Sequence, residues 1–319
     1  MAIYIDENKK VKNIFVNVNG SKKSISSAWV NKDGVPTKVF SINNQKDLYE
    51  VAPIDAISNW NYTLDDENNT ITLNYHKDNE ENVIVYANYY VNGKTYKTQI
   101  KNSAMTSVPN SSGKRYWMFQ ACNNIKHIIF SDIIDISNLT NSQGMFSYST
   151  NILSIHLGKA FNENNIEDMS YMFYYLPKLT TIDLINLDTS NATDMSFMFY
   201  SITNNVSSFD LSGFNTSNVK SMWGMFKYNN LNTLDLSSFD TSSVEDMHEM
   251  FACYTSNSSI LTTLNLCNWD THNVKNMNNM FKNNSKLESI YATEGKWSTS
   301  QATTTSMFSG CGISSVTYI

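Results

Sequence analysis

Three carboxylates recur at a nearly constant interval in the second half of the chain. Asp183, Asp210 and Asp235 are 27 and 25 residues apart, with His156 one interval before them and Asn265 one interval after. Like charges side by side in a sheet are mildly destabilising. Either flanking hydroxyl groups and water solvate this acidic column, or the column binds a ligand or a cation.

Aromatic side chains recur with the same interval. Tyr171, Phe197, Trp223 and His248 occupy the variable positions of a repeated Met-x-x-Met-Phe segment. Other tyrosines lie one to three residues after the Phe of a segment: Tyr148, Tyr174, Tyr175, Tyr200, Tyr228 and Tyr254. Rings in register could stack on sugars or anchor a protein partner; alternatively, they pack between repeats. The acidic column and the four ring positions are our candidate ligand-binding residues.

The sequence shows no constellation of catalytic or metal-binding residues. It contains no G-x-S-x-G, phosphate-loop, H-E-x-x-H, C-x-x-C or G-x-G-x-x-G pattern. The five histidines are scattered, and acids align only because a unit repeats. We therefore expect a protein that is not an enzyme, with no catalytic residue, no metal site and no cofactor.

The repeat interval predicts the elements that position these side chains. The Phe of the segment falls at residues 119, 146, 173, 199, 226, 251, 281 and 308. A fixed period of about 20–50 residues is typical of a solenoid. Leu179, Ile182 and Leu184 predict a short strand in each unit, and Met195 and Phe199 lie on one face of an expected short helix. Residues 113–319 are thus predicted to form an α/β leucine-rich-repeat-like solenoid of about seven repeats, with one short parallel strand and one short helix per repeat.

The N-terminal third has the pattern of β-structure. Asn19-Gly20 and Asn92-Gly93 are hairpin turn signals, and residues 83–91 alternate as a strand does. We predict a small β attachment module over residues 1–42, and a linker with a four-stranded β-module over residues 43–112.

Residues 234–251, LDLSSFDTSSVEDMHEMF, resemble the bacterial surface protein repeat of the BspA-like leucine-rich-repeat family. The resemblance extends over about residues 117–319 and implies an adhesive or binding solenoid. Residues 26–30 and 33–40, SSAWV and DGVPTKVF, are similar to N-terminal segments of phage and prophage tail proteins. That second resemblance implies attachment to a virion.

Composition and the absence of certain segments exclude further classes of function. The net charge is −6 and Arg115 is the only arginine, which argues against nucleic-acid partners. No apolar run is long enough to span a membrane, and the N-terminus has no signal-peptide pattern. A phage tail protein needs no secretion signal, because virions leave the cell by lysis, whereas a surface adhesin should carry a signal or an anchor.

Our main expectation is a phage tail fibre or receptor-binding subunit located in the virion, and the alternative is a BspA-like adhesin on the bacterial cell surface. The expected partners are a host-surface glycan or protein and, through the N-terminal module, other virion tail proteins. Tail fibres as a class are often trimeric, so a homo-oligomer is also an expected partner. The strand edge at residues 316–319 could supply a subunit contact, since an unpaired edge invites association.

Overall fold

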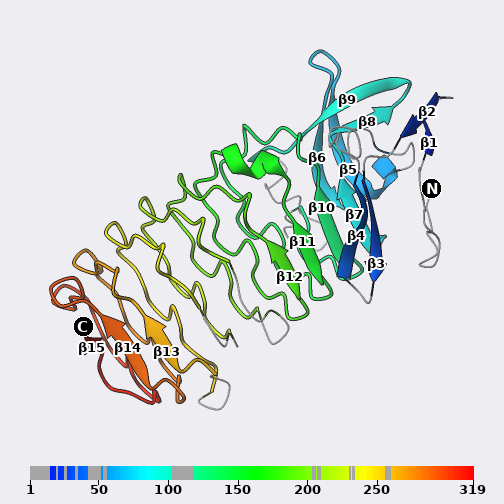
Figure 1. The fold of residues 1–319 in the computed structure, drawn as a ribbon. Helices are drawn as coiled ribbons and strands as arrows, with labels where there is room; N and C mark the ends of the chain where they lie inside the picture. The colour runs from blue at the N-terminus through cyan, green and yellow to red at the C-terminus, as the bar shows by residue number, and fades with distance from the viewer. Residues whose placement is uncertain are drawn as a thin grey trace, which may run out of the picture.

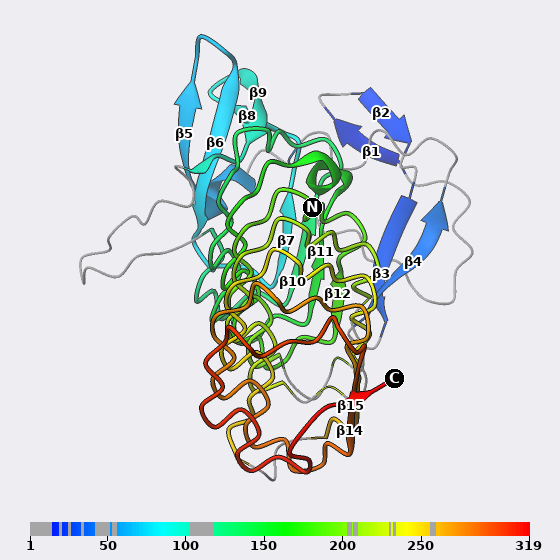
Figure 2. The same ribbon diagram turned by 90° about the vertical axis from the view of Figure 1, so that its left-hand side faces the viewer.

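The computed structural model describes the backbone of four N-terminal strands and most of the chain after residue 52. The described ranges are 15–18, 21–24, 27–32, 35–41, 52, 56–102, 118–202, 206, 210–229, 231, 234–255 and 260–319. From the N-terminal sheets the chain winds along a single axis to its C-terminal coil (Figure 1). Viewed from the side turned by 90°, the coils overlie one another (Figure 2). The predicted solenoid is therefore confirmed.

Parallel strands form one side of the coils. β7 (Asn82–Val85) pairs with β10 (His127–Phe130), β10 with β11 (Ser154–His156), and β11 with β12 (Thr181–Asp183). A second parallel sheet, nearer the C-terminus, consists of β13 (Thr263–Asn265), β14 (Ser289–Ala292) and β15 (Thr317–Tyr318). These strands fall where the leucine pattern places them, because alternate side chains must enter the core.

The remaining strands precede the solenoid. An antiparallel pair joins β1 (Phe15–Val18) to β2 (Ser21–Ser24), and another joins β3 (Ser27–Lys32) to β4 (Val35–Ser41). A four-stranded sheet has the order β5 (Trp60–Asp65), β6 (Thr70–His76), β9 (Lys94–Gln99), β8 (Asn88–Val91). The 3₁₀ turns are η1 (Ala56–Asn59) and η2 (Lys159–Glu163).

The expectation of N-terminal β-modules separate from the solenoid is not supported by this arrangement. Trp60, Ile71 and Tyr89 belong to the same continuous apolar core as the solenoid. β7 does not pair with β6 or β8, its neighbours in sequence. It pairs instead with β10 and so forms the first strand of the solenoid sheet. The side chains of residues 1–42 and the segment 103–117 lie outside the described residues.

The Met-x-x-Met-Phe segments are turns, so the predicted short helices are wrong. In the segment that begins at Met195, the N–H groups of Met198 and Tyr200 close turns onto the carbonyls of Met195 and Phe197. The N–H groups of Met195, Phe197 and Phe199 instead donate to carbonyls of the next coil, at 2.8–3.0 Å. A helix would direct these N–H groups within its own segment. Here every second N–H group of the segment points along the solenoid axis, toward the next coil.

A left-handed residue makes this alternation possible. The third position of each segment has a positive φ, occupied by Gly144, Tyr171, Phe197, Gly224, Glu249, Asn279 and Ser306. The conformation turns the chain so that both Met side chains and the Phe point inward. A Cβ on Gly224 would lie 2.4 Å from the Phe197 ring of the preceding coil, so glycine is required there on steric grounds as well.

The core confirms the inward Met and Phe positions. The eight phenylalanines stack from coil to coil with ring centroids 5.4–5.9 Å apart and nearly parallel planes. Met195 and Met198 have no exposed surface. No helix in the described part of the chain is long and apolar enough to cross a membrane.

Ser306→Gly should stabilise the protein. Ser306 is exposed and has a φ of 57°, a conformation that costs a non-glycine residue about 1–2 kcal/mol. The extra freedom of glycine in the unfolded chain offsets about half of this gain, which leaves roughly 0.5–1 kcal/mol. Urea unfolding would measure the difference. Ser306→Ala is the matched control, because alanine keeps the strain, and equal stability of the two variants would contradict the explanation.

Candidate binding face

The acidic column has an intramolecular role at the turn that follows it in each coil. Asp183 and Asn265 end β12 and β13, whereas the described residues around Asp210 and Asp235 form no strand. The Oδ1 atoms of Asp183, Asp210 and Asp235 accept the backbone N–H two residues later, at 3.2, 3.1 and 2.9 Å. Asn265 accepts the N–H of Cys267 in the same way at 3.1 Å. Such a bond shapes the turn that follows the strand. Because a neutral amide oxygen serves at Asn265, the turn requires an acceptor and not a charge.

The structure brings only part of this column together. His156 Nδ1 lies 2.9 Å from the Asp183 carboxylate, across neighbouring strands. Hydrogen bonds from the Ser212 side chain and backbone hold the pKa of Asp210 below its usual value, and Ser237 does the same for Asp235. No group of three potential metal ligands occurs among the described residues. Ligand binding by the acidic column stays a prediction.

The aromatic candidates form a continuous patch on the turn side of the coils. Tyr171 stacks on Phe197 at 4.9 Å, Phe197 contacts Trp223 at 4.8 Å, and Trp223 contacts His248 at 5.7 Å, all between ring centroids. The four ring positions predicted from the sequence thus make one column, with each ring touching the ring of the next coil.

A second column of tyrosines runs beside the first. Its successive ring contacts are Tyr148–Tyr174 at 5.1 Å, Tyr174–Tyr200 at 4.2 Å, Tyr200–Tyr228 at 5.1 Å and Tyr228–Tyr254 at 5.5 Å. Tyr171–Tyr174 and Phe197–Tyr200 contacts join the two columns. Tyr175 also contacts Tyr148, at 5.7 Å between ring centroids. We call the two columns together with Tyr175 the aromatic face: Tyr148, Tyr171, Tyr174, Tyr175, Phe197, Tyr200, Trp223, Tyr228, His248 and Tyr254.

Exposure separates the rings of this face into contact positions and supporting positions. Tyr148 is 48% exposed, Tyr175 39%, Trp223 38% and Tyr254 75%. Phe197 is only 8% exposed, between Tyr171 and Trp223, and therefore supports its neighbours. Ser196, the variable neighbour of Phe197, is also buried, and its hydroxyl lies 2.7 Å from that of Ser221.

Tyr254 and Trp223 were not distinguished from the other rings by the sequence pattern. The Tyr254 ring is turned 85° from that of Tyr228, and the Trp223 ring is turned 60° from that of Phe197. Both rings expose more surface than the rings that they contact. The backbone and rotamer of each residue determine this orientation, and residue spacing does not encode it.

The electrostatics of the face favour neutral hydroxyl groups. Burial and the neighbouring hydroxyls of Tyr148 and Tyr200 raise the pKa of Tyr174, and burial raises the pKa of Tyr171 and Tyr200. These phenols therefore stay protonated near neutral pH. Lys227 lies 4.8 Å from the centre of the Tyr228 ring and pairs with Glu249.

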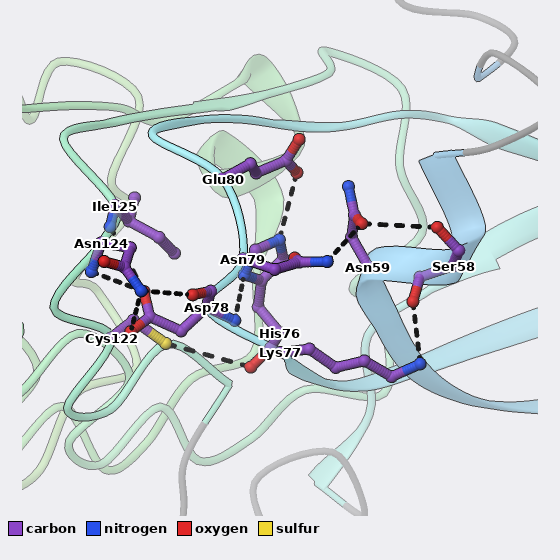
Figure 3. A network of polar contacts seen from close by, with 10 residues as sticks. All are labelled: Ser58, Asn59, His76, Lys77, Asp78, Asn79, Glu80, Cys122, Asn124 and Ile125. Carbon is purple, nitrogen blue, oxygen red and sulfur yellow. Dashed lines mark hydrogen bonds and ion pairs between the residues drawn. The ribbon is translucent and has the colours of Figure 1, made fainter.

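A separate polar network closes the N-terminal end of the solenoid (Figure 3). The Asp78 carboxylate accepts the backbone N–H groups of Asn123, Asn124 and Ile125, at 2.8–3.3 Å. His76 is buried, and its Nε2 lies 3.1 Å from Glu80. These side chains satisfy the hydrogen-bonding groups of the first coil that have no preceding coil to pair with, so we assign them a structural role. The sequence pattern did not single them out, since Asp78 and its partners are about 45 residues apart.

Comparison with known proteins identifies a family and two distant structures. Residues 114–210 and 202–316 match the family described as "Mycoplasma protein of unknown function, DUF285". No curated protein matches the chain. A leucine-rich repeat protein from Bacteroides ovatus ATCC 8483 is 11% identical, over 73% of this chain and 70% of that one, with a TM-score of 0.27. A leucine rich cell surface protein from Faecalibacterium prausnitzii A2-165 is 12% identical, over 73% of this chain and 86% of that one, with a TM-score of 0.17. No match supports the expected phage-tail resemblance of residues 1–42.

Replacing Asp210 and Asp235 with Asn should reduce the acid sensitivity of the fold. Their pKa values are lowered from 3.8 in the folded state, so they contribute stability that is present above that value and is lost as pH falls below it. Asn keeps the acceptor but cannot titrate. We expect a smaller loss of stability between about pH 5 and pH 3 in the double variant, measured by urea unfolding at each pH.

Asn265→Asp is the matched reverse change, because it introduces a carboxylate at the equivalent strand end. It should steepen the same pH dependence. An unchanged pH profile in both variants would contradict this account of the acidic column.

Proposed function

The chain belongs to the DUF285 family, and we propose that it is a non-enzymatic recognition protein of the bacterial cell surface that binds a macromolecular ligand through its aromatic face. The observation that carries this proposal is the exposure of large rings on four of five successive coils. Tyr148, Tyr175, Trp223 and Tyr254 are all more than a third exposed and lie within one continuous patch. Contiguous exposed apolar surface of this kind marks interaction sites.

Backbone strain supports the proposal. Tyr148, Tyr171, Tyr175, Phe197 and Tyr228 all have φ values between 55° and 61°. Bulky side chains rarely adopt this conformation, which costs about 1–2 kcal/mol for each residue. Gly144 and Gly224 take the same conformation at the positions that correspond to Tyr171 and Phe197. Ser201 and Gly310 take it at the positions that correspond to Tyr148, Tyr175 and Tyr228. Glu249, Asn279 and Ser306 also take this conformation, so the left-handed turn belongs to the fold, but the coil does not need a ring at this position. A bulky ring in a strained conformation that the fold leaves open to other residues supports a role in binding.

Rigidity is the second supporting property. Each ring is held by rings of the adjacent coils, so few side-chain rotamers must be frozen when a ligand binds. Loss of side-chain freedom is a main cost of association, and tyrosine offers large contact area at low entropic cost. A stacked aromatic face is thus well suited to recognition.

The cell-surface reading takes the place of our main expectation from the sequence. The tail-fibre expectation depended on residues 1–42, whereas the family match begins at residue 114. The cell-surface proposal depends on the resemblance of residues 234–251, and of the equivalent residues in other repeats, to a surface-protein repeat. Those repeats form the coils that carry the aromatic face. Antibody labelling of intact and permeabilised cells of the source organism tests it. Labelling only after permeabilisation would rule out the surface location.

Loss of Trp223 or Tyr254 should weaken recognition without unfolding the protein. We expect Trp223→Ala and Tyr254→Ala each to weaken binding of the purified protein to cells of the host on which the source bacterium lives by about ten-fold or more, as for exposed aromatic anchors elsewhere. Flow cytometry with labelled protein measures the binding, and thermal unfolding checks the fold.

Tyr318→Ala provides a matched control, because Tyr318 is 53% exposed on β15, away from the aromatic face. It should bind as well as the wild type. Equal binding by all three variants would overturn the proposed role of the face.

A further inference from the structure

The tyrosine column of the aromatic face presents one chemical group on each successive coil. Phenol rings lie on five successive coils, from Tyr148 to Tyr254, with centroid separations of 4.2–5.5 Å. A surface that repeats the same group is matched best by a ligand that also repeats the same group. A polypeptide changes its side chain at every step, whereas a linear glycan presents the same ring and hydroxyls each time, at about the length of one sugar.

We propose, on the basis of the function proposed above, that the ligand of the aromatic face is a neutral, linear glycan chain lying along the solenoid axis. Four steps separate the coils of Tyr148 and Tyr254. At about 4.8 Å per step, the face is roughly 20 Å long. It therefore spans several sugar units, and a short oligosaccharide cannot reach both ends.

The orientation of the rings defines two kinds of contact. Tyr174 and Tyr200 stack with planes only 11° apart, so they cover part of each other's faces. Trp223 and Tyr254 are turned out of the columns and leave ring surface free. Sugar rings would stack on Trp223 and Tyr254, while the phenol hydroxyls between them would exchange hydrogen bonds with sugar hydroxyls.

Charge complementarity argues for a neutral chain. Lys227, the cation in contact with the Tyr228 ring, is paired with Glu249. His248 Nε2 also faces Glu249, at 3.7 Å. Asp194, the carboxylate beside Tyr171, already accepts the backbone N–H of Ser196 at 2.8 Å. An anionic glycan would find no free cation among these contacts.

The test treats host cells in two ways before the labelled protein is added. Periodate oxidises the vicinal diols of glycans, and protease removes surface proteins. We expect periodate to abolish binding and protease to leave most of it. Glycans released from the same cells, separated into neutral and acidic pools and then by size, serve as competitors.

The neutral pool should compete, and fragments of six or more sugars should compete at least about ten-fold better than trisaccharides, since only the longer ones span the face. Trp223→Ala should remove this advantage of length, and Trp223→Phe, which keeps a ring, should restore part of it. These variants are compared only where thermal unfolding shows an intact fold.

Each result separates this inference from the proposed function. Binding that needs Trp223 and Tyr254 but survives periodate and is lost after protease treatment would overturn the glycan assignment and keep the recognition function. Competition by the acidic pool alone, or equal competition by short and long fragments, would also overturn it. Binding that is indifferent to Trp223 and Tyr254 would overturn the proposed function itself.

Discussion

The backbone hydrogen bonds between coils are the constraint on which the rest of the structure depends. In each Met-x-x-Met-Phe segment, alternate N–H groups donate along the axis to the next coil, as Met195 does to Ser221 and Phe197 to Trp223. Buried hydroxyls add to this connection, since Thr216 and Thr241 donate to carbonyls of the following coil at 2.8 and 2.9 Å. A coil cannot shift along the chain without breaking this entire set, so every side chain stays in register with its counterpart one interval away.

Register explains why the sequence predicted so much of the fold. The interval between phenylalanines is enough to predict a solenoid, and the alternation in Leu179–Leu184 is enough to predict a strand. The helices failed because inward positions at Met195 and Met198 are three residues apart in both a helix and a series of turns. Only the destination of the N–H groups distinguishes the two, and that destination is a carbonyl more than twenty residues away. The sequence of a single repeat therefore contains no information about which carbonyl accepts each N–H group.

For the candidate sites, the sequence likewise predicted which residues lie together but not how exposed each of them is. Spacing placed Tyr171, Phe197, Trp223 and His248 in one column, and the structure has them in contact. Spacing did not reveal that Phe197 is buried and that Tyr254 is the most exposed ring of the face, because exposure depends on φ and on the rotamer. It also did not reveal that the acidic column accepts local backbone N–H groups. Asp183 and Asn265 resemble ligand-binding residues in a sequence, yet each completes a turn.

The strained rings connect stability with recognition. A left-handed tyrosine such as Tyr171 or Tyr175 is unfavourable in isolation, and contacts with neighbouring rings offset part of that cost. Those contacts form only when adjacent coils are stacked, so the face exists only in the assembled solenoid. The same stacking leaves the rings little freedom before any ligand arrives, which lowers the entropy lost on binding. In this protein the interaction that offsets the local strain is also the one that would prepare the aromatic face for the proposed ligand.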